Sequence, residues 1–417
     1  MALGISPRWL FSFFLIALCL AVAAGGEARA GGDADSLRRR AVRFVRENIL
    51  VDTHLDAPWR MRGKGPDLSG RSNAGNFDIP RARDGGLDVA FMAIFIPSSR
   101  EGTPGAVTLA EELIGAVRGF ALRHPELCAV PLSASEAREH AGRGLISLPL
   151  GMENGAPLGG SLENLRMFHR LGIRYLTLVH SKDNHLADAA TDDRRTWGGL
   201  SPFGAEAVRE MNRLGIMIDV SHASDSAFYQ VLRISRAPVI ASHSSCRHFT
   251  PLWSRNMDDR MIRELASRGG VLHISFGSIF LGETFRREAP VFARKLAAFR
   301  KKEGLPEDHP RVAAFRARYR AEHPGAVPGV EDVADHIEHA AALGGVEHVG
   351  LGSDFDGVGE GLPDGLASVS DYPNLVAELM RRGWTEERLR LVCGGNTLRV
   401  WEEVERKGEE IRREAER

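Results

Sequence analysis

The chain has few cysteines for its length. Four occur in 417 residues, and three of them, Cys128, Cys246 and Cys393, lie beyond the N-terminal segment. One pair could form a bridge in an oxidising compartment, which would leave one odd thiol. Thiols so widely separated nevertheless exclude a disulfide framework or a zinc–thiolate site.

An excess of charge of either sign is also absent. The formal net charge is −1 at pH 7, and the sequence has no basic stripe with interleaved aromatic residues. Both observations argue against nucleic acid as a partner. The chain likewise has no Gly-rich phosphate loop and no internal repeat. Its length and its ordinary hydrophobic content of 43% suit one large α/β barrel with insertions.

A long apolar stretch occurs only at the N-terminus. Arg8 precedes the apolar residues 9–24, and Ala28-Arg29-Ala30 follows as a small-x-small cleavage site. This pattern predicts a secretory signal peptide over residues 1–30, cleaved near Ala30, with an uncleaved anchor as the alternative. No second segment is long enough to span a bilayer. We therefore expect an exported protein, periplasmic or extracellular, without a stable membrane anchor.

Eight short apolar runs alternate with helical patterns along the rest of the chain. The runs cover residues 49–52, 88–96, 145–152, 173–179, 216–220, 238–241, 270–276 and 348–352. Such alternation predicts parallel strands with crossover helices, and eight of these units close into a (β/α)₈ TIM barrel. We expect one domain over residues 31–417, with a charged helical insertion at 281–323 after the seventh strand. An open doubly wound sheet is the alternative, although no phosphate loop marks a switch point.

Side chains that bind metals or protons stand at the ends of these runs. They are His54 and Asp56, Glu153, His180, His222, His243 and Asp354, after runs one, three, four, five, six and eight. His54 and Asp56 converge because residues i and i+2 of an extended chain point to the same side. In a barrel all these positions share one rim, where active sites are built. One histidine alone would suggest a core hydrogen bond, but the whole set predicts a functional site.

The residue types suggest two zinc ions. The candidate ligands are His54, Asp56, Glu153, His222 and His243, an imidazole and carboxylate set that suits Zn²⁺. Glu153 can bridge the ions with one oxygen on each, and ions roughly 3.5–4 Å apart can share a hydroxide. Asp354 would accept the proton of that water. His180 is expected to donate a hydrogen bond to the substrate carbonyl and its oxyanion.

Two basic residues near the rim differ in their expected roles. Arg255, in the loop after the sixth run, is a candidate to bind a substrate carboxylate, because a guanidinium matches the carboxylate fork. A surface arginine is the alternative. Lys182 follows the fourth run, where some dinuclear barrel hydrolases bridge their metals with a modified lysine. Here His180 occupies that place, so we expect Lys182 to lie in the loop or to face solvent.

These residues lie in motifs that resemble the membrane (renal-type) dipeptidase family of metallopeptidases, peptidase family M19. The motifs occur in family order from about residue 48 to about residue 401. They are Asp52-Thr53-His54-Leu55-Asp56, Gly151-Met152-Glu153-Asn154-Gly155, Tyr175-Leu176-Thr177-Leu178-Val179-His180-Ser181, Gly199-Leu200-Ser201-Pro202-Phe203-Gly204, Ile218-Asp219-Val220-Ser221-His222, Ser242-His243-Ser244-Ser245, Ser254-Arg255-Asn256 and Gly352-Ser353-Asp354-Phe355-Asp356-Gly357.

The resemblance implies a barrel of the metal-dependent hydrolase type that holds two zinc ions and hydrolyses dipeptides. It implies one ion on His54, Asp56 and Glu153, and a second on Glu153, His222 and His243. It also implies that His180 and Arg255 contact the substrate and that Asp354 lies near the catalytic water. Tolerance of a D-residue at the C-terminal side, opening of β-lactams in some members and a homodimer are further implications of the resemblance.

Two features depart from the family pattern, and two other functions stay open. Asn154 stands where the family often has a glycine, and the insertion at 281–323 is long, so the preferred side chains are in doubt. A barrel metallohydrolase for cyclic amides, β-lactams or another non-peptide amide is the alternative enzyme. A non-catalytic zinc-stabilised binding protein is the alternative from another class, but it predicts the loss of a ligand or of Asp354, and all are present.

Overall fold

The computed structural model describes the chain apart from residues 1–34, 64, 73, 306–308, 324–326 and 360. The predicted signal peptide, residues 1–30, lies outside the described residues. Among the residues that are described, no helix combines the length and the apolar character needed to cross a membrane.

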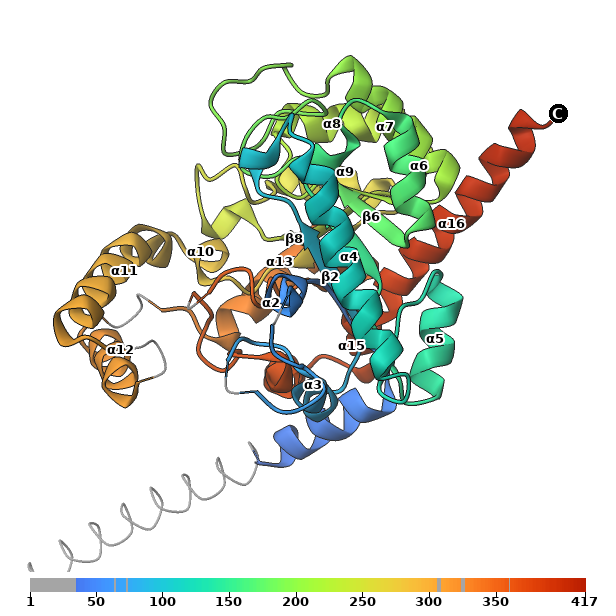
Figure 1. Ribbon diagram of the computed structural model, residues 1–417. Coiled ribbons are helices and arrows are strands. Elements are labelled where there is room, and N and C mark those ends of the chain that lie inside the picture. The colour runs from blue at the N-terminus through green and yellow to red at the C-terminus, as the bar shows by residue number, and fades with distance from the viewer. Residues whose placement is uncertain (1–34, 64, 73, 306–308, 324–326, 360) are drawn as a thin grey trace, which may run out of the picture.

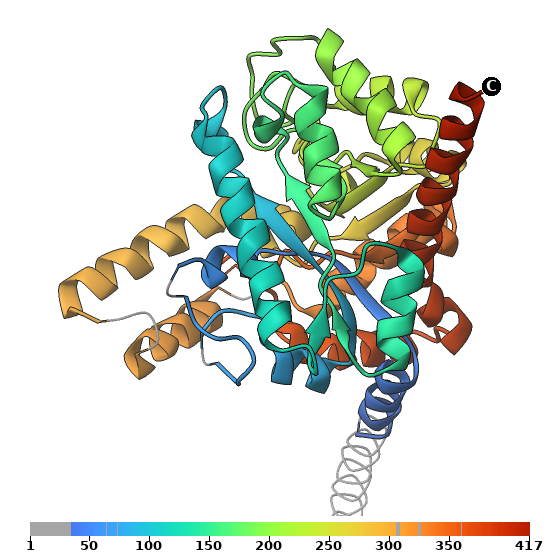
Figure 2. The same cartoon turned by 45° about the vertical axis from the view of Figure 1, so that its right-hand side comes forward.

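Eight parallel strands form a ring, as predicted (Figures 1 and 2). In ring order they are β1 (Leu50–Leu55), β2 (Leu87–Phe95), β5 (Leu150–Glu153), β6 (Ile173–Thr177), β7 (Met217–Asp219), β8 (Ile240–Ser244), β9 (Val271–Ile274) and β10 (Val349–Leu351). The runs are apolar throughout because both faces of each strand are covered. The result is the TIM-barrel architecture.

The ring closes between its first and last strands, where the contacts are sparse. A parallel bridge joins Leu55 to Phe355, just beyond β10. The Asp354 N–H donates to the His54 carbonyl at 3.1 Å, and the Asp56 N–H donates to the Phe355 carbonyl at 2.9 Å. The Thr53 hydroxyl donates to the carbonyl of Leu351 at 3.1 Å. Closure therefore depends on the backbone of the residues at the predicted site.

Helices cover the outside of the ring (Figure 1). A first helix spans residues 35–47. The others are α2 (Ala57–Met61), α3 (Ile79–Gly85), α4 (Gly105–Arg123), α5 (Ala134–Gly142), α6 (Leu162–Arg170), α7 (Pro202–Leu214), α8 (Asp225–Ile234), α9 (Asp259–Ser267), α10 (Ser278–Leu281), α11 (Glu283–Glu303), α12 (Pro310–Glu322), α13 (Val330–Gly344), α14 (Tyr372–Arg381), α15 (Glu386–Arg390) and α16 (Asn396–Ala415). Helix α7 begins with an ordinary cap, because Ser201 accepts the Gly204 N–H at 2.8 Å and Pro202 fills the first position.

The third apolar run forms two strands, whereas the sequence predicted one. It divides into β4 (Ile146–Ser147) and β5, and β2 pairs with both. Pro149 stands at the break and has no N–H to give to a ladder. A short extra strand, β3 (Cys128–Ala129), pairs with β4 outside the ring. The first and sixth runs also extend further than expected, so His54 lies inside β1 and His243 lies inside β8, and neither follows its strand.

The predicted insertion after the seventh strand consists of helices α11 and α12. They project from the side of the barrel as a hairpin (Figures 1 and 2). Aromatic side chains join the two helices, with ring centroids 4.7 Å apart for Phe299 and Phe315 and 4.9 Å apart for Phe292 and Tyr319. The strong charge of this segment thus belongs to the solvated faces of a helix pair.

Large apolar side chains fill the lower half of the barrel interior, which is the half at the amino ends of the strands. Phe91 of β2 packs against Tyr175 of β6 and against Trp401 of α16, with ring centroids 5.5 and 5.2 Å apart. All three side chains are fully buried. Helix α16 thus closes the barrel at the amino ends of the strands and leaves the opposite rim open for the polar residues.

Candidate active site

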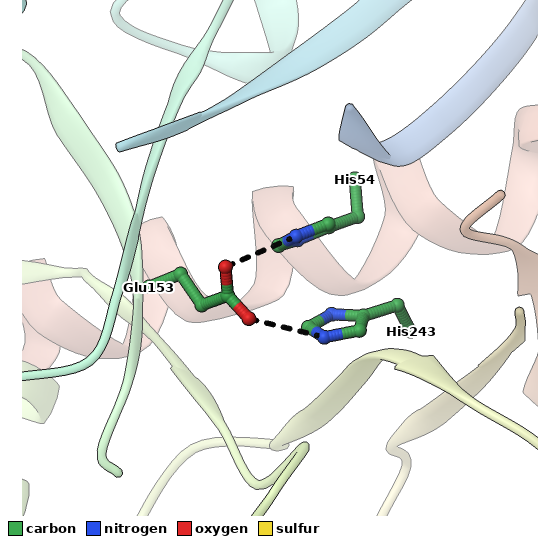
Figure 3. Close-up of side chains that lie close together, drawn as sticks. All are labelled: His54, Glu153 and His243. Carbon is green, nitrogen blue, oxygen red and sulfur yellow. Dashed lines mark ion pairs between the residues drawn. The ribbon is translucent and has the colours of Figure 1, made fainter. Parts of the chain in front are cut away.

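Glu153 lies at the centre of the polar rim. It is the last residue of β5 and is 4% exposed. Its Oε2 lies 3.5 Å from Nε2 of His54, and its Oε1 lies 3.4 Å from Nε2 of His243 (Figure 3). The two carboxylate oxygens therefore face different imidazoles.

The other predicted rim residues gather around Glu153. Its Oε1 lies 3.1 Å from Nε2 of His222 and 3.5 Å from Nε2 of His180. Asp56 approaches the same nitrogen of His54 that Glu153 approaches, with its Oδ2 3.5 Å from Nε2 of His54. The structure thus brings together all the side chains that the ends of the apolar runs predicted, including Asp354, which groups with His54 and Asp56.

These side chains form three overlapping groups of possible metal ligands, each within 4.8 Å. The groups are His54, Glu153 and His243; Glu153, His180 and His222; and His54, Asp56 and Asp354. Glu153 and His54 each belong to two groups. The groups differ from the predicted partition, because His180 stands close enough to Glu153 and His222 to be a ligand. His180 is the most exposed imidazole of the set, with 22% of its side chain accessible.

The donor set fits metal ions. The Nε2 atom of His54 is buried and has no hydrogen-bond partner among the described residues. The Nε2 atoms of His222 and His243 lie only 3.0 Å apart, both directed at the same carboxylate oxygen. An orphaned nitrogen is costly in a buried site, and a borderline cation would satisfy it.

Burial and mutual charge set the protonation of the rim. Burial raises the pKa of Glu153, but the imidazoles, chiefly His54 and His180, outweigh it and hold that pKa well below its usual value. Burial lowers the pKa of His243 to about 3 and that of His222 well below its usual value. The anionic carboxylate and the neutral imidazoles of His222 and His243 are forms that ligate metals. His54 differs, because its burial is outweighed by Tyr175 and Glu153, which hold its pKa well above the usual value.

Asp354 behaves differently from Glu153. Burial, aided by the nearby charges of Asp56 and Glu153, raises its pKa well above the usual value. A carboxyl group whose pKa is raised in this way accepts a proton more readily than an ordinary carboxylate. Asp354 and His222 also have left-handed backbones, with φ of 65° and 67°, which β-carbons disfavour and which recur at functional sites.

Partners beneath the rim orient two of the histidines. The Tyr175 hydroxyl lies 2.8 Å from Nδ1 of His54. The Ser242 hydroxyl donates to Asp219 at 2.6 Å and lies 2.8 Å from Nδ1 of His243, so it accepts that N–H. Both contacts leave Nε2 directed at Glu153, as a ligating histidine requires.

Sequence reasoning did not single out Tyr175 or Asp219 as orienting residues. Their signal was present, however. Asp219 is a carboxylate inside an apolar run, and Tyr175 is a phenol in the strand that precedes His180. Polar groups at inward positions of buried strands need partners, and a nearby histidine supplies one.

Arg255 is buried close to the rim and is not a surface arginine. It is 4% exposed, and its guanidinium donates to the Ser244 hydroxyl at 2.7 Å and to the His243 carbonyl at 2.8 Å. Burial lowers its pKa to about 10, so it stays cationic at neutral pH. Lys182 is 60% exposed and lies 3.7 Å from Asp192, which confirms that it faces solvent.

A cavity of about 330 Å³ opens above these residues. Its polar lining includes Asp56, Glu153, His180, His222, His243 and Asp354. Trp59 and Phe95, which sequence reasoning did not select, form an aromatic wall with ring centroids 5.8 Å apart. The Phe95 ring also packs 4.9 Å from the ring of His180. A cavity of this size suits a small ligand with polar and apolar parts.

A closed β/α barrel with buried carboxylates and imidazoles on the carboxyl rim defines a barrel metallohydrolase. The family model for membrane dipeptidases, peptidase family M19, matches residues 38–415. Dipeptidase 3 of Mus musculus is 33% identical over 378 residues, which is 88% of this chain and 67% of the mouse protein.

Two solved structures are also similar. The probable dipeptidase PvdM from Pseudomonas aeruginosa is 27% identical, with a TM-score of 0.76 over 89% of this chain and 99% of that one. A metallopeptidase from Rhodobacter sphaeroides, liganded with a phosphinate mimic of the dipeptide L-Ala-D-Ala, is 26% identical, with a TM-score of 0.69 over 86% of this chain and 99% of that one.

The chain therefore belongs to the membrane dipeptidase family, peptidase family M19. It is a metallo-dipeptidase, as the sequence motifs predicted, and its substrate is a dipeptide. Metal dependence follows from family membership and agrees with the groups of possible ligands on the rim.

Proposed function

We propose that this protein is a dinuclear zinc dipeptidase. The observation that carries the proposal is the position of Glu153, whose two oxygens face separate imidazole groups (Figure 3). A carboxylate so placed suits a bridge between two ions. Bound ions would acidify a shared water and polarise the peptide carbonyl.

The proposed ligands follow from this bridge. His54, Asp56 and Glu153 would hold one ion, and Glu153, His222 and His243 the other. His180 is assigned to the substrate, because it is the most exposed imidazole and neutral, since burial lowers its pKa. From that position its N–H would stabilise the carbonyl oxygen as negative charge develops there.

Asp354 and Arg255 complete the proposed mechanism. Asp354 would take the proton of the attacking water on a carboxylate oxygen and return it to the leaving amine, which its raised pKa favours. Arg255 would bind the free carboxylate of the dipeptide and so select against longer peptides. Because the solved Rhodobacter sphaeroides relative holds a mimic of L-Ala-D-Ala, we propose that D-residues are accepted at the C-terminal side as well as L-residues.

The substitution Asp354→Asn tests this assignment. Hydrolysis of L-L and L-D dipeptides should collapse, while the zinc content measured by mass spectrometry stays at two ions per chain. Lys182→Ala is the matched control, because this exposed side chain lies outside the proposed machinery and should leave kcat and KM unchanged. If Asp354→Asn hydrolyses dipeptides at the wild-type rate, the proton-transfer role is wrong. If the wild type binds zinc but cleaves only cyclic amides or β-lactams, the dipeptide assignment fails.

We further propose that the mature protein begins near Ala30, is exported to the periplasm or the extracellular space, and acts as a homodimer. The signal pattern of residues 1–30 and the family resemblance support these proposals. N-terminal sequencing of secreted material and light scattering on the purified chain test them. An intact N-terminus or a monomeric mass would contradict the corresponding proposal.

A further inference from the structure

A second cluster of metal-binding side chains lies outside the barrel rim. His248 belongs to the short 3₁₀ turn η3 (Arg247–Phe249), Asp259 to the first turn of α9, and His339 to α13. Their ligand atoms all lie within 4.8 Å of one another. None of these residues follows a barrel strand directly, and none lines the cavity above Glu153.

His339 contacts both of the other side chains. Nε2 of His339 lies 2.8 Å from Oδ1 of Asp259. The rings of His248 and His339 stack with centroids 4.4 Å apart and an interplanar angle of 24°. Two imidazoles and a carboxylate form an N₂O donor set, which suits Zn²⁺ and neighbouring borderline ions better than Mg²⁺ or Ca²⁺.

The backbone around the cluster is held firmly. The Cys246 N–H donates to Nδ1 of the buried His336 at 2.9 Å, which ties the residue before η3 to α13. The ring of Phe249 packs 4.4 Å from the ring of His336. Helices α9 and α13 pack so closely that a β-carbon on Gly344 would lie 2.9 Å from the β-carbon of Ala266. The ligands are thus presented from three fixed elements.

The position of the cluster also allows an ion to enter. His248 is exposed, and the side chains of Asp259 and His339 are 41% and 20% accessible. A zinc ion held here would take bonds of roughly 2.0–2.2 Å to the three side chains, with water as the fourth ligand. Arg247 is paired with Asp225 at 2.6 Å, and Arg263 donates to the backbone carbonyl of Asp259 at 3.3 Å. Among the described residues neither arginine forms an ion pair with the Asp259 carboxylate, whose partner is His339.

We propose that His248, Asp259 and His339 form an additional, structural site for a divalent transition-metal ion such as Zn²⁺. The ion joins η3 to α9 and α13. It thereby fixes the segment between β8 and α9, which carries Arg255. The site is independent of the ions on the rim and adds one ion to the zinc content of the chain.

The test uses the zinc-loaded mature protein and Zn²⁺ alone as the probe. Zinc per chain is measured after equilibrium dialysis against buffered free zinc, for the wild type, His248→Gln and the control His348→Gln. His348 is a partly exposed histidine that contacts the Gly270 carbonyl and belongs to none of the possible ligand groups. We expect the wild type and the control to bind one ion more than His248→Gln, which should fold normally because His248 is exposed.

Thermal unfolding provides a second readout. Added zinc should raise the Tm of the wild type and of His348→Gln more than that of His248→Gln. An ion that binds only the folded state stabilises the folded state. Equal zinc content in all three proteins at every free zinc concentration would overturn the proposed site. Equal Tm gains would overturn its structural role. The test compares the zinc content of variants with that of the wild type. If the rim held a number of ions other than two, the zinc content of all three proteins would change equally, and the difference between them would stay the same.

Discussion

The two halves of the barrel interior follow opposite rules. The lower half is filled by Phe91, Tyr175 and Trp401, which are fully buried and pack as rings. The upper half holds buried carboxylates and imidazoles, with strained backbone at His222 and Asp354. The lower half stabilises the folded chain by burying apolar surface. The upper half offsets part of this stabilisation, because it buries polar and charged groups.

Tyr175 belongs to both halves and explains how they coexist. Its ring packs against Phe91, while its hydroxyl lies 2.8 Å from Nδ1 of His54. The rigid lower half therefore fixes the orientation of a rim imidazole through a single side chain. Variants that affect one half, the other or this link should separate stability from metal binding.

The largest effect is expected from Glu153→Gln, which should abolish the proposed carboxylate bridge between the two ions. Dipeptide hydrolysis should fall at least about 10³-fold, because an amide cannot supply an anionic oxygen to each side. Zinc content should fall as well, whereas circular dichroism should stay that of the wild type because glutamine keeps the shape of the side chain. A variant that retains two ions and full activity would show that Glu153 is not the bridge.

Trp401→Ala should give the opposite result in the lower half. Removing a fully buried indole should lower the free energy of unfolding by about 3–5 kcal/mol, measured by urea titration. Zinc content per folded chain should not change. Trp401→Phe is the matched control and should cost much less, because the indole N–H has no hydrogen-bond partner among the described residues and only volume is lost. Loss of zinc from folded Trp401→Ala would contradict the separation of the two halves.

Acid should destabilise the metal-free chain through His273, which lies outside the rim. Burial lowers its pKa to about 4, from 6.5 when exposed. Between these two pKa values only the unfolded chain binds the proton. The stabilisation is therefore complete above the pKa that His273 has in the unfolded chain, and it is lost as the pH falls below that value. His273 alone should account for about 2 kcal/mol between about pH 7.5 and pH 5. Urea titrations of wild type and His273→Gln should show the smaller acid loss in the variant; equal losses would contradict the assignment.

Tyr175→Phe should have the smallest effect, and it tests the link between the halves. Removing the hydroxyl should weaken zinc binding by about 10–100-fold, since the partner that orients His54 is lost. The free energy of unfolding should change by only about 1 kcal/mol, because the ring packing stays. Phe91→Leu is the control: it should lower stability and leave zinc affinity unchanged. Unaltered zinc affinity in Tyr175→Phe would show that the lower half does not orient the rim.

Most of the fold could be predicted because strands and helices of a barrel differ in local pattern. The continuous apolar runs indicated the strands, and their polar last residues indicated the rim. The split of the third run around Pro149 was harder to predict, because β4 and β5 both pair with β2 and this pairing is not local. The extra strand β3 is only two residues long and leaves little periodicity to detect.

The site was predictable in its members but not in its connections. His54 and Glu153 followed from their places after apolar runs, whereas the contact of His54 with Tyr175 depends on how neighbouring strands are aligned. The cluster of His248, Asp259 and His339 could not be predicted, because none of its members directly follows a barrel strand and His339 is 80 residues from Asp259. Their convergence depends on how α9 and α13 pack, which sequence spacing does not encode.

The closure of the ring between β1 and the residues after β10 has a consequence for the synthesis of the protein. His54 is synthesised early and Asp354 late, and the backbone hydrogen bond between them helps to close the barrel. A chain that stops before Asp354 already carries His54, Asp56, Glu153, His222 and His243, but it lacks the segment against which the first strand must lie. We therefore expect a chain truncated before Asp354 to lack hydrolytic activity, although it contains every proposed metal ligand.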